Sequence, residues 1–246
     1  MRYAIISDIH SNYEALAAVC EDIDKESVDQ IICLGDIVGY GADPGRCIAE
    51  VKKRTAWVVA GNHDQAAIGK LGMDYFNLNA RKAAEWTAKN LSADEKKYLA
   101  SLPLSRNSQT PDCGFVTVHS SPDSPELWRY VLSADEAEYQ FERFPQQICL
   151  IGHSHQPMFW QLNKSGECAV AGREYLHFEP DKRYIINVGS VGQPRDGDSR
   201  SCYAICDSER KELVIRRLEY NIALAQRKIM KAGLPPRLAE RLAFGF

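Results

Sequence analysis

The sequence has no apolar run long enough to cross a membrane and no secretory leader pattern at its start. Its first apolar run, residues 3–6, stops at Ser7 and Asp8 and is far shorter than the core of a signal peptide. No later stretch approaches the roughly 20 apolar residues that span a bilayer. We therefore expect a cytoplasmic protein with no membrane partner.

A strong charge of one sign and paired cysteines are missing as well. The formal net charge is only −3, so we expect no sequence-specific binding of nucleic acid. The eight cysteines form no C-x-x-C pair, and most lie in apolar stretches, as reduced core thiols of a cytosolic protein do. Cys202 and Cys206 are the one pair considered as metal ligands, and their spacing is a weak indication of metal binding.

Length and composition are those of an ordinary globular chain. Hydrophobic residues make up 45% and charged residues 26% of the 246 residues, without an internal repeat or a low-complexity linker. Layered cores of this length often form one domain. We therefore predict a single domain over residues 1–246, with a helical insertion at about 72–104 and C-terminal helices at about 221–244.

Strand patterns and helix patterns alternate along the chain. Residues 3–7 have the pattern of a strand, and residues 11–14 (SNYE) have the capping-box pattern that opens a helix. Residues 92–95 (SADE) repeat this capping box inside the insertion, which Pro103 ends. Two strand-rich halves covered by helices predict an α/β layered sandwich. The other strands are expected at 30–34, 57–60, 115–118, 148–151, around Val170, and at 184–187, 201–205 and 213–216, and the other helices at 44–54, 222–231 and 236–244.

Every early strand ends in residues that can bind a metal ion. A single buried histidine is usually a structural one, but that explanation would have to hold separately at each of these strand ends. His177, the only histidine outside them, is expected at the surface or at a sheet edge. Glycine precedes three of the ligand positions, as expected where the backbone turns sharply. The strand ends are Asp8-Ile9-His10, Gly35-Asp36, Gly61-Asn62-His63-Asp64, Val118-His119 and Gly152-His153-Ser154-His155.

The spacing of these residues predicts a shared site. In an extended segment residues i and i+2 project to the same side, so Asp8 with His10, and His153 with His155, can face one point. Carboxylate, carbonyl-type and imidazole donors without thiolate suit Mn, Fe, Zn or similar divalent ions. Seven candidate ligands exceed the four of structural zinc. They suffice for two ions if one carboxylate bridges, which points to catalysis.

This ordered set closely resembles the motifs of the calcineurin-like metallophosphoesterase superfamily, and none of the motif positions is missing. Residues 35–44 (GDIVGYGADP) and 187–195 (NVGSVGQPR) are similar to its small bacterial branch of phosphodiesterases and diadenosine-tetraphosphatase-like proteins. The resemblance therefore covers most of the chain. It implies a four-layer α/β/β/α metallophosphoesterase sandwich with the metals at the strand ends.

The resemblance also implies a role for each motif residue. Asp8, His10 and His155 would hold the first metal, Asn62, His119 and His153 the second, and Asp36 would bridge both. His63 would be the catalytic residue, contacting the substrate phosphate and stabilising or protonating the leaving oxygen. Asp64 stands where the family often has Glu, and capping of the next helix is a second explanation for it.

Two divalent metal ions (Mn, Fe, Zn, Ni or Mg) are the expected cofactors, with Mn favoured. Against the two carboxylates they leave a charge of about +2, and a bridging water would be deprotonated near neutral pH for in-line attack on phosphorus. His63 would assist the leaving group as a general acid. The expected function is hydrolysis of a phosphate ester or phosphoanhydride by a metal-bridging hydroxide, in a phosphodiesterase or nucleotide hydrolase with a small phosphorylated or nucleotide substrate.

Asn12, Tyr40 and Arg195 flank the ligands and are candidates for substrate binding. Asn12 has a second explanation as a helix cap, and Arg195 has one as an ion-pair partner of Asp196 or Asp198. Residues 128–130 (WRY) follow the loop after His119, where a base or aromatic leaving group can stack, although Trp128 is equally explained as a core residue.

Two other functions compete with this one. A protein or small-molecule phosphomonoesterase would use the same ligands, although the absence of a long docking domain favours a small substrate. A metal-binding scaffold without turnover, such as a retromer subunit similar to this superfamily, is expected to lose the acid or a ligand histidine, and here His63 and all seven ligands are present. A redox or structural metal protein is disfavoured because thiolate ligands are lacking.

Overall fold

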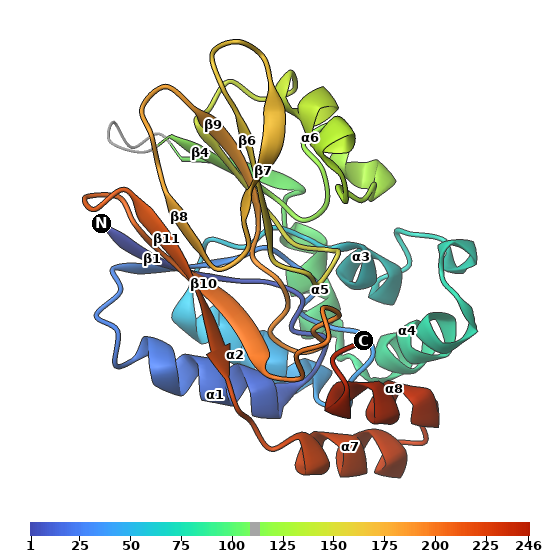
Figure 1. Cartoon of the computed structure of the whole chain (residues 1–246). Helices are drawn as coiled ribbons and strands as arrows, with labels where there is room; N and C mark the ends of the chain where they lie inside the picture. Colours follow the sequence, from blue (N-terminus) through green and yellow to red (C-terminus); the bar gives the residue numbers. More distant parts are fainter. Residues whose placement is uncertain (109–113) are drawn as a thin grey trace.

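Two β-sheets pack face to face, and helices cover the outer side of each (Figure 1). The computed structural model describes residues 1–108 and 114–246. Helices α1 and α2 lie against one sheet, and α6 lies against the other. The prediction of a four-layer α/β/β/α sandwich is therefore confirmed.

The strands divide into a five-stranded and a six-stranded sheet. The first has the order β2-β1-β10-β11-β8, in which only β1 and β2 are parallel. The second has the order β3-β4-β5-β9-β6-β7, with β4, β5 and β9 parallel. The bounds are β1 Arg2–Ile6, β2 Gln30–Cys33, β3 Ser105–Asn107, β4 Phe115–Val118, β5 Ile148–Ile151, β6 Met158–Leu162, β7 Cys168–Gly172, β8 Tyr175–His177, β9 Arg183–Asn187, β10 Ser201–Asp207 and β11 Glu212–Leu218.

The helices begin where the sequence supplies capping chemistry. Helix α2 has Pro44 at its start and three basic residues in its last turn, both of which favour those ends. Ser92 and Ser133 open α5 and α6 with complete capping boxes. The bounds are α1 Tyr13–Ile23, α2 Pro44–Arg54, α3 Asn62–Ala67, α4 Leu78–Asn90, α5 Ala93–Ser101, α6 Ala134–Phe141, α7 Ile222–Lys231 and α8 Pro236–Glu240, with short 3-10 helices η1 Met73–Tyr75, η2 Pro125–Leu127 and η3 Arg241–Ala243.

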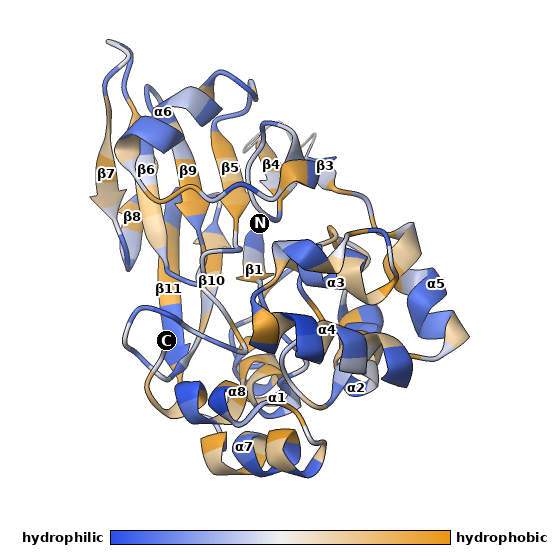
Figure 2. Cartoon of the chain, turned by 90° about the vertical axis from the view of Figure 1, so that its right-hand side faces the viewer, coloured by the Kyte–Doolittle hydropathy of each residue, from blue (hydrophilic) through white to orange (hydrophobic). Residues whose placement is uncertain are grey.

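Apolar side chains fill the spaces between the layers. In Figure 2 hydrophobic residues are frequent in the strands, and the helices carry both hydrophobic and hydrophilic residues. Leu16 and Val19 of α1 are buried against the first sheet, and each such burial stabilises the fold by roughly 1.5–3 kcal/mol. A separate apolar cluster joins α3 and α4 to α7 and α8. The helical insertion and the C-terminal helices therefore pack together on one side of the sandwich.

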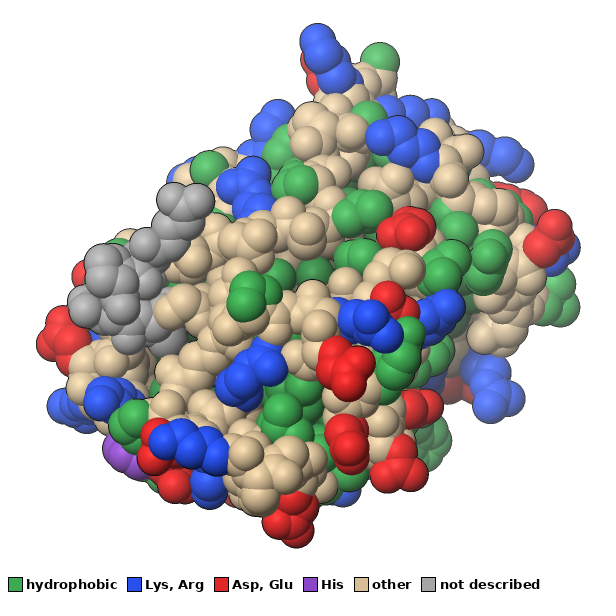
Figure 3. All heavy atoms as spheres, turned by 90° about the horizontal axis from the view of Figure 1, so that it is seen from above, with side chains coloured by type: hydrophobic (Ala, Val, Ile, Leu, Met, Phe, Trp, Pro, Cys, Tyr) green, Lys and Arg blue, Asp and Glu red, His purple; other side chains and the backbone are tan. Residues whose placement is uncertain are grey.

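The helices are short, and the sequence carries charges of both signs. None of the helices in the two described ranges is both long and apolar enough to span a bilayer. On the described part of the face seen in Figure 3, acidic and basic side chains are intermixed rather than gathered in one basic patch.

Three sequence predictions are corrected by the structure. The cap of α1 is Asn12, whose Oδ1 accepts from Ala15 N at 3.2 Å, because the N–H of Ser11 is already bonded to Ile37 O. Residues 57–60 are not a strand: only Val58 forms a bridge, with Cys33, before the chain turns away. The expected helix 236–244 is shorter and splits into α8 and η3.

Several elements were not predicted from the sequence. They are α6, the edge strands β3 and β8, and β6, which lies between β9 and β7. The helices of the insertion and of the C-terminal region lie in the expected ranges, while the assignment of the whole chain to one domain stays a prediction. Six cysteines are free thiols, and Cys113 lies outside the described residues; the six are Cys20, Cys33, Cys47, Cys149, Cys168 and Cys202.

Replacing Gly61 with alanine is expected to destabilise the protein and to disturb the predicted metal centre. A Cβ atom at position 61 would lie 2.1 Å from Asp36 Oδ1 and 2.4 Å from Asp36 N. Overpacking of this kind costs about 1–3 kcal/mol, and each kcal/mol lowers the melting temperature of a chain of this size by roughly 2–4 °C. A thermal unfolding experiment would measure this fall in melting temperature. Gly72→Ala is the matched control, because a Cβ there meets no atom within 4 Å. Equal melting temperatures for the two variants would contradict the expectation.

Candidate metal centre

The loops that follow β1, β2, β4 and β5 bring buried carboxylates and imidazoles together. Three overlapping groups have their potential ligand atoms within 4.8 Å of one another, and every member is buried. The structure separates His153 from His155, which belong to different groups, as the resemblance implies. The groups are Asp8, His10 and His155; Asp36, His119 and His153; and His10, Asp36 and His63.

The two carboxylates lie at the middle of the cluster. Asp8 Oδ1 is 3.2 Å from His155 Nε2 and 3.7 Å from His10 Nε2. Asp36 Oδ2 is 3.3 Å from His119 Nε2 and 3.6 Å from His10 Nε2. The other oxygen of each carboxylate is held by the backbone, since Asp8 Oδ2 accepts from His153 N at 3.0 Å and Asp36 Oδ1 accepts from His63 N at 2.8 Å. One oxygen of each is thus fixed and the other faces the imidazoles.

A backbone carbonyl orients the ring of each candidate histidine ligand. A carbonyl can only accept, so the ring nitrogen beside it carries the proton, and the opposite nitrogen is left as a lone pair. For three of the four rings that opposite nitrogen is Nε2, and for His153 it is Nδ1. The pairs are His10 Nδ1 with Val38 O (3.2 Å), His119 Nδ1 with Leu34 O (2.8 Å), His155 Nδ1 with Gln193 O (2.6 Å) and His153 Nε2 with Trp128 O (2.9 Å).

Unpaired polar atoms in this cluster fit a divalent cation. Asp8 Oδ1, Asn62 Oδ1 and His119 Nε2 are buried without a hydrogen-bond partner, which is costly for ordinary polar groups. His10 Nε2 and His155 Nε2 lie only 3.0 Å apart, although both carry lone pairs when their Nδ1 atoms donate to carbonyls. A cation accepts all of these lone pairs at once, so the donor set matches a site for metals with oxygen and nitrogen ligands.

The buried carboxylates of the cluster also need a positive charge beside them. Burial alone would raise the pKa of Asp8, but the neighbouring His155 and His119 hold that pKa well below its usual range. Burial would lower the pKa of His119, and Asp36 and Asp8 reverse this and raise it to about 9. Burial lowers the pKa of His153 to about 3. Without a metal ion, a proton on His119 would have to balance the carboxylates.

The backbone of the ligand loops is strained, which corrects one sequence argument. Five of the seven candidate ligands have φ between +50° and +67°, a region that costs non-glycine residues roughly 1–2 kcal/mol each. The D-x-H and H-x-H segments are therefore not extended, and their side chains converge through left-handed turns. Main-chain bonds hold these turns, such as His10 N to Asp36 O at 2.9 Å. The five residues are Asp8, His10, Asp36, His153 and His155.

His63 lies beside the ligands, at the start of α3. Its ring packs against Tyr40 and Phe76, with centroids 4.4 and 4.7 Å away, and its Nδ1 is buried without a partner. Burial lowers the pKa of His63 to about 4, with Asp36 opposing and Arg195 adding to the shift, so the ring is neutral at pH 7. Asp64 accepts from Gly61 N at 3.0 Å and from Val38 N at 3.1 Å, which confirms its role as a cap of α3.

Two of the three predicted substrate-binding residues line a cavity of about 200 Å³ beside the ligands. Tyr40 and Arg195 form its wall together with Asp36, Asn62 and His63. Asn12 is not among the residues that line this cavity. Its Nδ2 donates to Gly192 O at 2.8 Å, while its Oδ1 caps α1.

Arg195 has no carboxylate partner within the described ranges. It donates to Gln193 Oε1 at 2.9 Å and to Tyr40 Oη at 3.3 Å. The alternative pairing with Asp196 or Asp198 is wrong, because Asp196 pairs with Arg217 and Asp198 with Arg200. Its guanidinium therefore remains available to an anion in the cavity.

Trp128 and Tyr130 of the segment 128–130 line the cavity, and the stacking of a base or aromatic leaving group on this segment stays a prediction. Tyr130 stacks on His153, with centroids 4.1 Å apart and ring planes 16° apart. Trp128 fixes His153 through its carbonyl and lines the cavity, whereas Arg129 pairs with Asp123 at 2.7 Å. Phe76 and Tyr75 of the insertion also line the cavity and were missed, since nothing in their spacing marks them.

The remaining candidates lie away from the cluster. His177 is exposed on the edge strand β8, as predicted. Cys202 and Cys206 are buried in β10, and neither belongs to a group that could hold a metal within residues 1–108 and 114–246. Burial raises the pKa of the Cys202 thiol to about 12, so it is protonated.

Comparison with known proteins identifies the family. Residues 1–211 match the calcineurin-like phosphoesterase superfamily domain. The chain is 41% identical over 243 residues to an uncharacterized protein of Methanocaldococcus jannaschii, covering 98% of this chain and 97% of that one. Among solved structures, it is similar to a metallophosphoesterase from Sphaerobacter thermophilus, with 40% identity and a TM-score of 0.85 over 100% of this chain and 99% of the other. A hypothetical protein from Pyrococcus horikoshii shares the fold at 19% identity, with a TM-score of 0.79 over 100% of this chain and 98% of that one. The chain therefore belongs to the calcineurin-like phosphoesterase superfamily, as its motifs suggested.

Proposed function

We propose that the protein is a dinuclear metal-dependent phosphoesterase that hydrolyses a phosphodiester or a phosphoanhydride of a small substrate. Six of the seven candidate ligands converge in these buried groups, and this convergence supports the proposal most strongly. The seventh, Asn62, lines the adjoining cavity, and its Oδ1 is buried and unpaired, as are Asp8 Oδ1 and His119 Nε2. Mn is the favoured ion among the divalent metals that a set of four imidazoles, two carboxylates and one amide suits.

The candidate ligands divide between two positions. Asp8, His10 and His155 would hold one ion, and Asn62, His119 and His153 the other. Asp36 lies in contact range of imidazoles from both groups, 3.6 Å from His10 Nε2 and 3.3 Å from His119 Nε2, which suits a bridging carboxylate. When bound, the ions would lower the pKa of water and neutralise charge on the phosphoryl oxygens.

The residues of the chain that line the cavity would bind and orient the phosphate. Arg195 has no carboxylate partner in the described ranges, and its guanidinium beside Tyr40 can donate to phosphoryl oxygens. His63, neutral in the free site, can donate a hydrogen bond to the leaving oxygen, and the negative charge of a bound phosphate would favour its protonation. Tyr130, stacked on His153, and Phe76, packed on His63, hold these rings and exclude water.

The proposal is tested by turnover of bis(p-nitrophenyl) phosphate and of p-nitrophenyl phosphate by purified protein that has been stripped of metal and then reloaded with Mn²⁺. We expect no turnover by the stripped protein, recovery on reloading, and a higher kcat/KM for the diester. Preference for the monoester would identify a phosphomonoesterase instead. Bound metal without turnover of either ester, or of nucleotides in a follow-up screen, would favour the scaffold alternative and contradict the proposal.

A further inference from the structure

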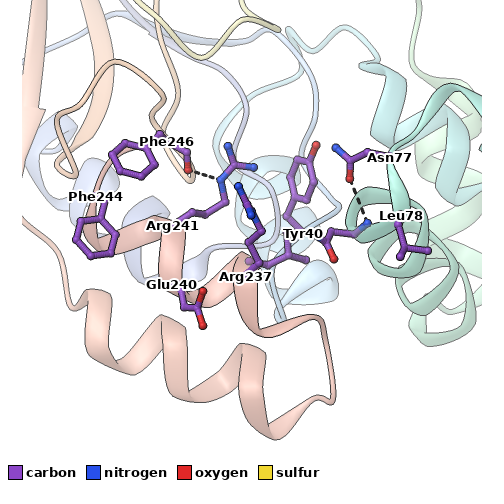
Figure 4. Close-up of a pocket in the computed structure, with 10 residues that line it drawn as sticks. Tyr40, Asn77, Leu78, Arg237, Glu240, Arg241, Phe244 and Phe246 are labelled. Carbon is purple, nitrogen blue, oxygen red and sulfur yellow. Dashed lines mark hydrogen bonds between the residues drawn. The ribbon is translucent and has the colours of Figure 1, made fainter.

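A second cavity of about 580 Å³ adjoins the cavity at the metal centre. Tyr40 and Asn77 line both of them, so these two residues lie where the cavities adjoin. One wall comes from the start of α4 and the other from α8 and the residues that follow it (Figure 4). The 580 Å³ lie within the roughly 300–1,000 Å³ of small-molecule sites, whereas 200 Å³ leave room for little beyond the scissile phosphate.

Two arginines line this second cavity. In Figure 4 the side chains of Arg237 and Arg241 extend toward Tyr40, and the Nε of Arg241 donates to the main-chain oxygen of Phe246. Neither arginine has a carboxylate side chain as ion-pair partner in the described part of the chain. Glu240 also lines the cavity, but it makes no ion pair with them and points away in Figure 4.

The arginines of the two cavities are electrostatically coupled. Burial lowers the pKa of Arg241 to about 10, and the nearby Arg195 and Arg237 add to that shift. Arg195 of the first cavity and Arg237 of the second therefore both lie near Arg241, and the three form a row of cations along the two cavities. Because like charges at close range repel one another, this row becomes favourable when an anion lies along it.

Apolar surface accompanies this row of cations. The structure exposes twelve large hydrophobic side chains among the described residues, and six of these line one cavity or the other. Phe244 and Phe246 stack with centroids 5.6 Å apart and ring planes 17° apart, and they are 59% and 60% exposed. Exposed aromatic faces beside guanidinium groups suit a flat organic ring attached to phosphate.

We propose that the second cavity is a substrate subsite for a phosphorylated half that carries a flat ring, as in a nucleoside diphosphate or polyphosphate. Arg237 and Arg241 bind the additional phosphate, the Phe244 and Phe246 face receives the ring, and the scissile phosphate lies between Arg195 and the metal centre. This assignment rests on the proposed phosphoesterase function and defines its substrate class.

The test measures binding of a non-hydrolysable nucleotide, so that it is independent of turnover. The probe is adenosine 5′-(α,β-methylene)diphosphate, titrated by calorimetry into the Mn²⁺-loaded full chain. Arg237→Ala and Arg241→Ala are each expected to raise the Kd at least about tenfold, since each removes a charge-assisted hydrogen bond. Arg241→Lys keeps the charge without the guanidinium fork and is expected to fall between wild type and Arg241→Ala.

Arg227→Ala is the matched control, because Arg227 is exposed on α7 and does not line the cavity. It should bind the probe as wild type does, and all variants should keep the melting temperature and metal content of wild type. Inorganic pyrophosphate should bind at least about tenfold more weakly than the nucleotide if a ring is recognised.

Equal Kd values for wild type, Arg237→Ala and Arg241→Ala, or no binding by wild type, would overturn the subsite. Equal Kd values for pyrophosphate and nucleotide would overturn its ring-binding half. Failure of the phosphoesterase function shows itself separately, as absence of Mn²⁺-dependent turnover of bis(p-nitrophenyl) phosphate by wild type.

Discussion

Asp36→Asn should abolish phosphoesterase turnover and reduce the metal content of the purified protein. The amide keeps the shape of the side chain and can still accept from His63 N, but it removes a negative charge that lies beside imidazoles of both ligand groups. Lewis-acid stabilisation by bound metal is worth several kcal/mol, and each 1.4 kcal/mol is about tenfold in rate. We therefore expect kcat/KM for the diester to fall by a factor of about 10³ or more.

Asp74→Asn is the control for this change. Asp74 lies in η1 with its side chain 99% exposed, paired only with Arg81, and surface pairs of this kind contribute little. Its metal content and turnover should equal those of wild type. An Asp36→Asn protein that keeps two ions and wild-type turnover would show that Asp36 does not bridge them.

His63→Ala should keep both metal ions and lose most of its turnover of substrates with a poor leaving group. The side chain lies beside the cluster and faces the cavity, whereas its main-chain N–H, which holds Asp36, is retained in alanine. Loss of a proton or hydrogen-bond donor at the leaving oxygen costs about 10² to 10⁴ in rate. The loss should be large for an alkyl leaving group and small for p-nitrophenolate, which departs without help from an acid.

His177→Ala is the matched control, because His177 is the histidine outside the metal centre and is exposed on β8. Steady-state kinetics with the two leaving groups, together with metal analysis of the same samples, separates the possibilities. If His63→Ala loses metal along with activity, His63 acts as a ligand. If its activity is unchanged with both leaving groups, His63 has no role at the leaving oxygen.

The ligand motifs could be predicted from the sequence because each is short, contiguous and placed at the end of an apolar strand. Asp8, Asp36, His119 and His153 all come directly after such runs or within a few residues of them. Burial of the strands and the polarity of the loops after them are local properties, so pattern analysis finds them. The layered fold is predicted by the same alternation.

The backbone conformations of the ligand loops could not be predicted from the sequence. The extended geometry assumed for residues 8–10 and 153–155 was wrong because strand periodicity ends at Ile6 and Ile151, and the left-handed turns beyond are imposed by bonds to distant residues. An example is Gly192 N, which bonds to Asp8 O at 3.0 Å. Contacts between segments so far apart in the sequence leave no periodic pattern.

The second cavity could not be predicted from the sequence for a related reason. Nothing in the sequence distinguishes Arg237 and Arg241 from the solvated charges of a terminal helix. Only the packing of α7 and α8 against α4 places them next to Tyr40. Helix α6, by contrast, was missed although Ser133 and Glu136 form a complete capping box. Its eight residues are too few for a clear helical period.

The proposed function depends on two metal ions in this cluster with Asp36 between them. The most direct measurement is an anomalous difference map from a crystal of the Mn²⁺-loaded protein, collected at the Mn absorption edge. Two peaks are expected, one beside Asp8, His10 and His155 and the other beside Asn62, His119 and His153. A single peak, or no peak at these residues in protein that has been fully loaded with Mn²⁺, would contradict the account.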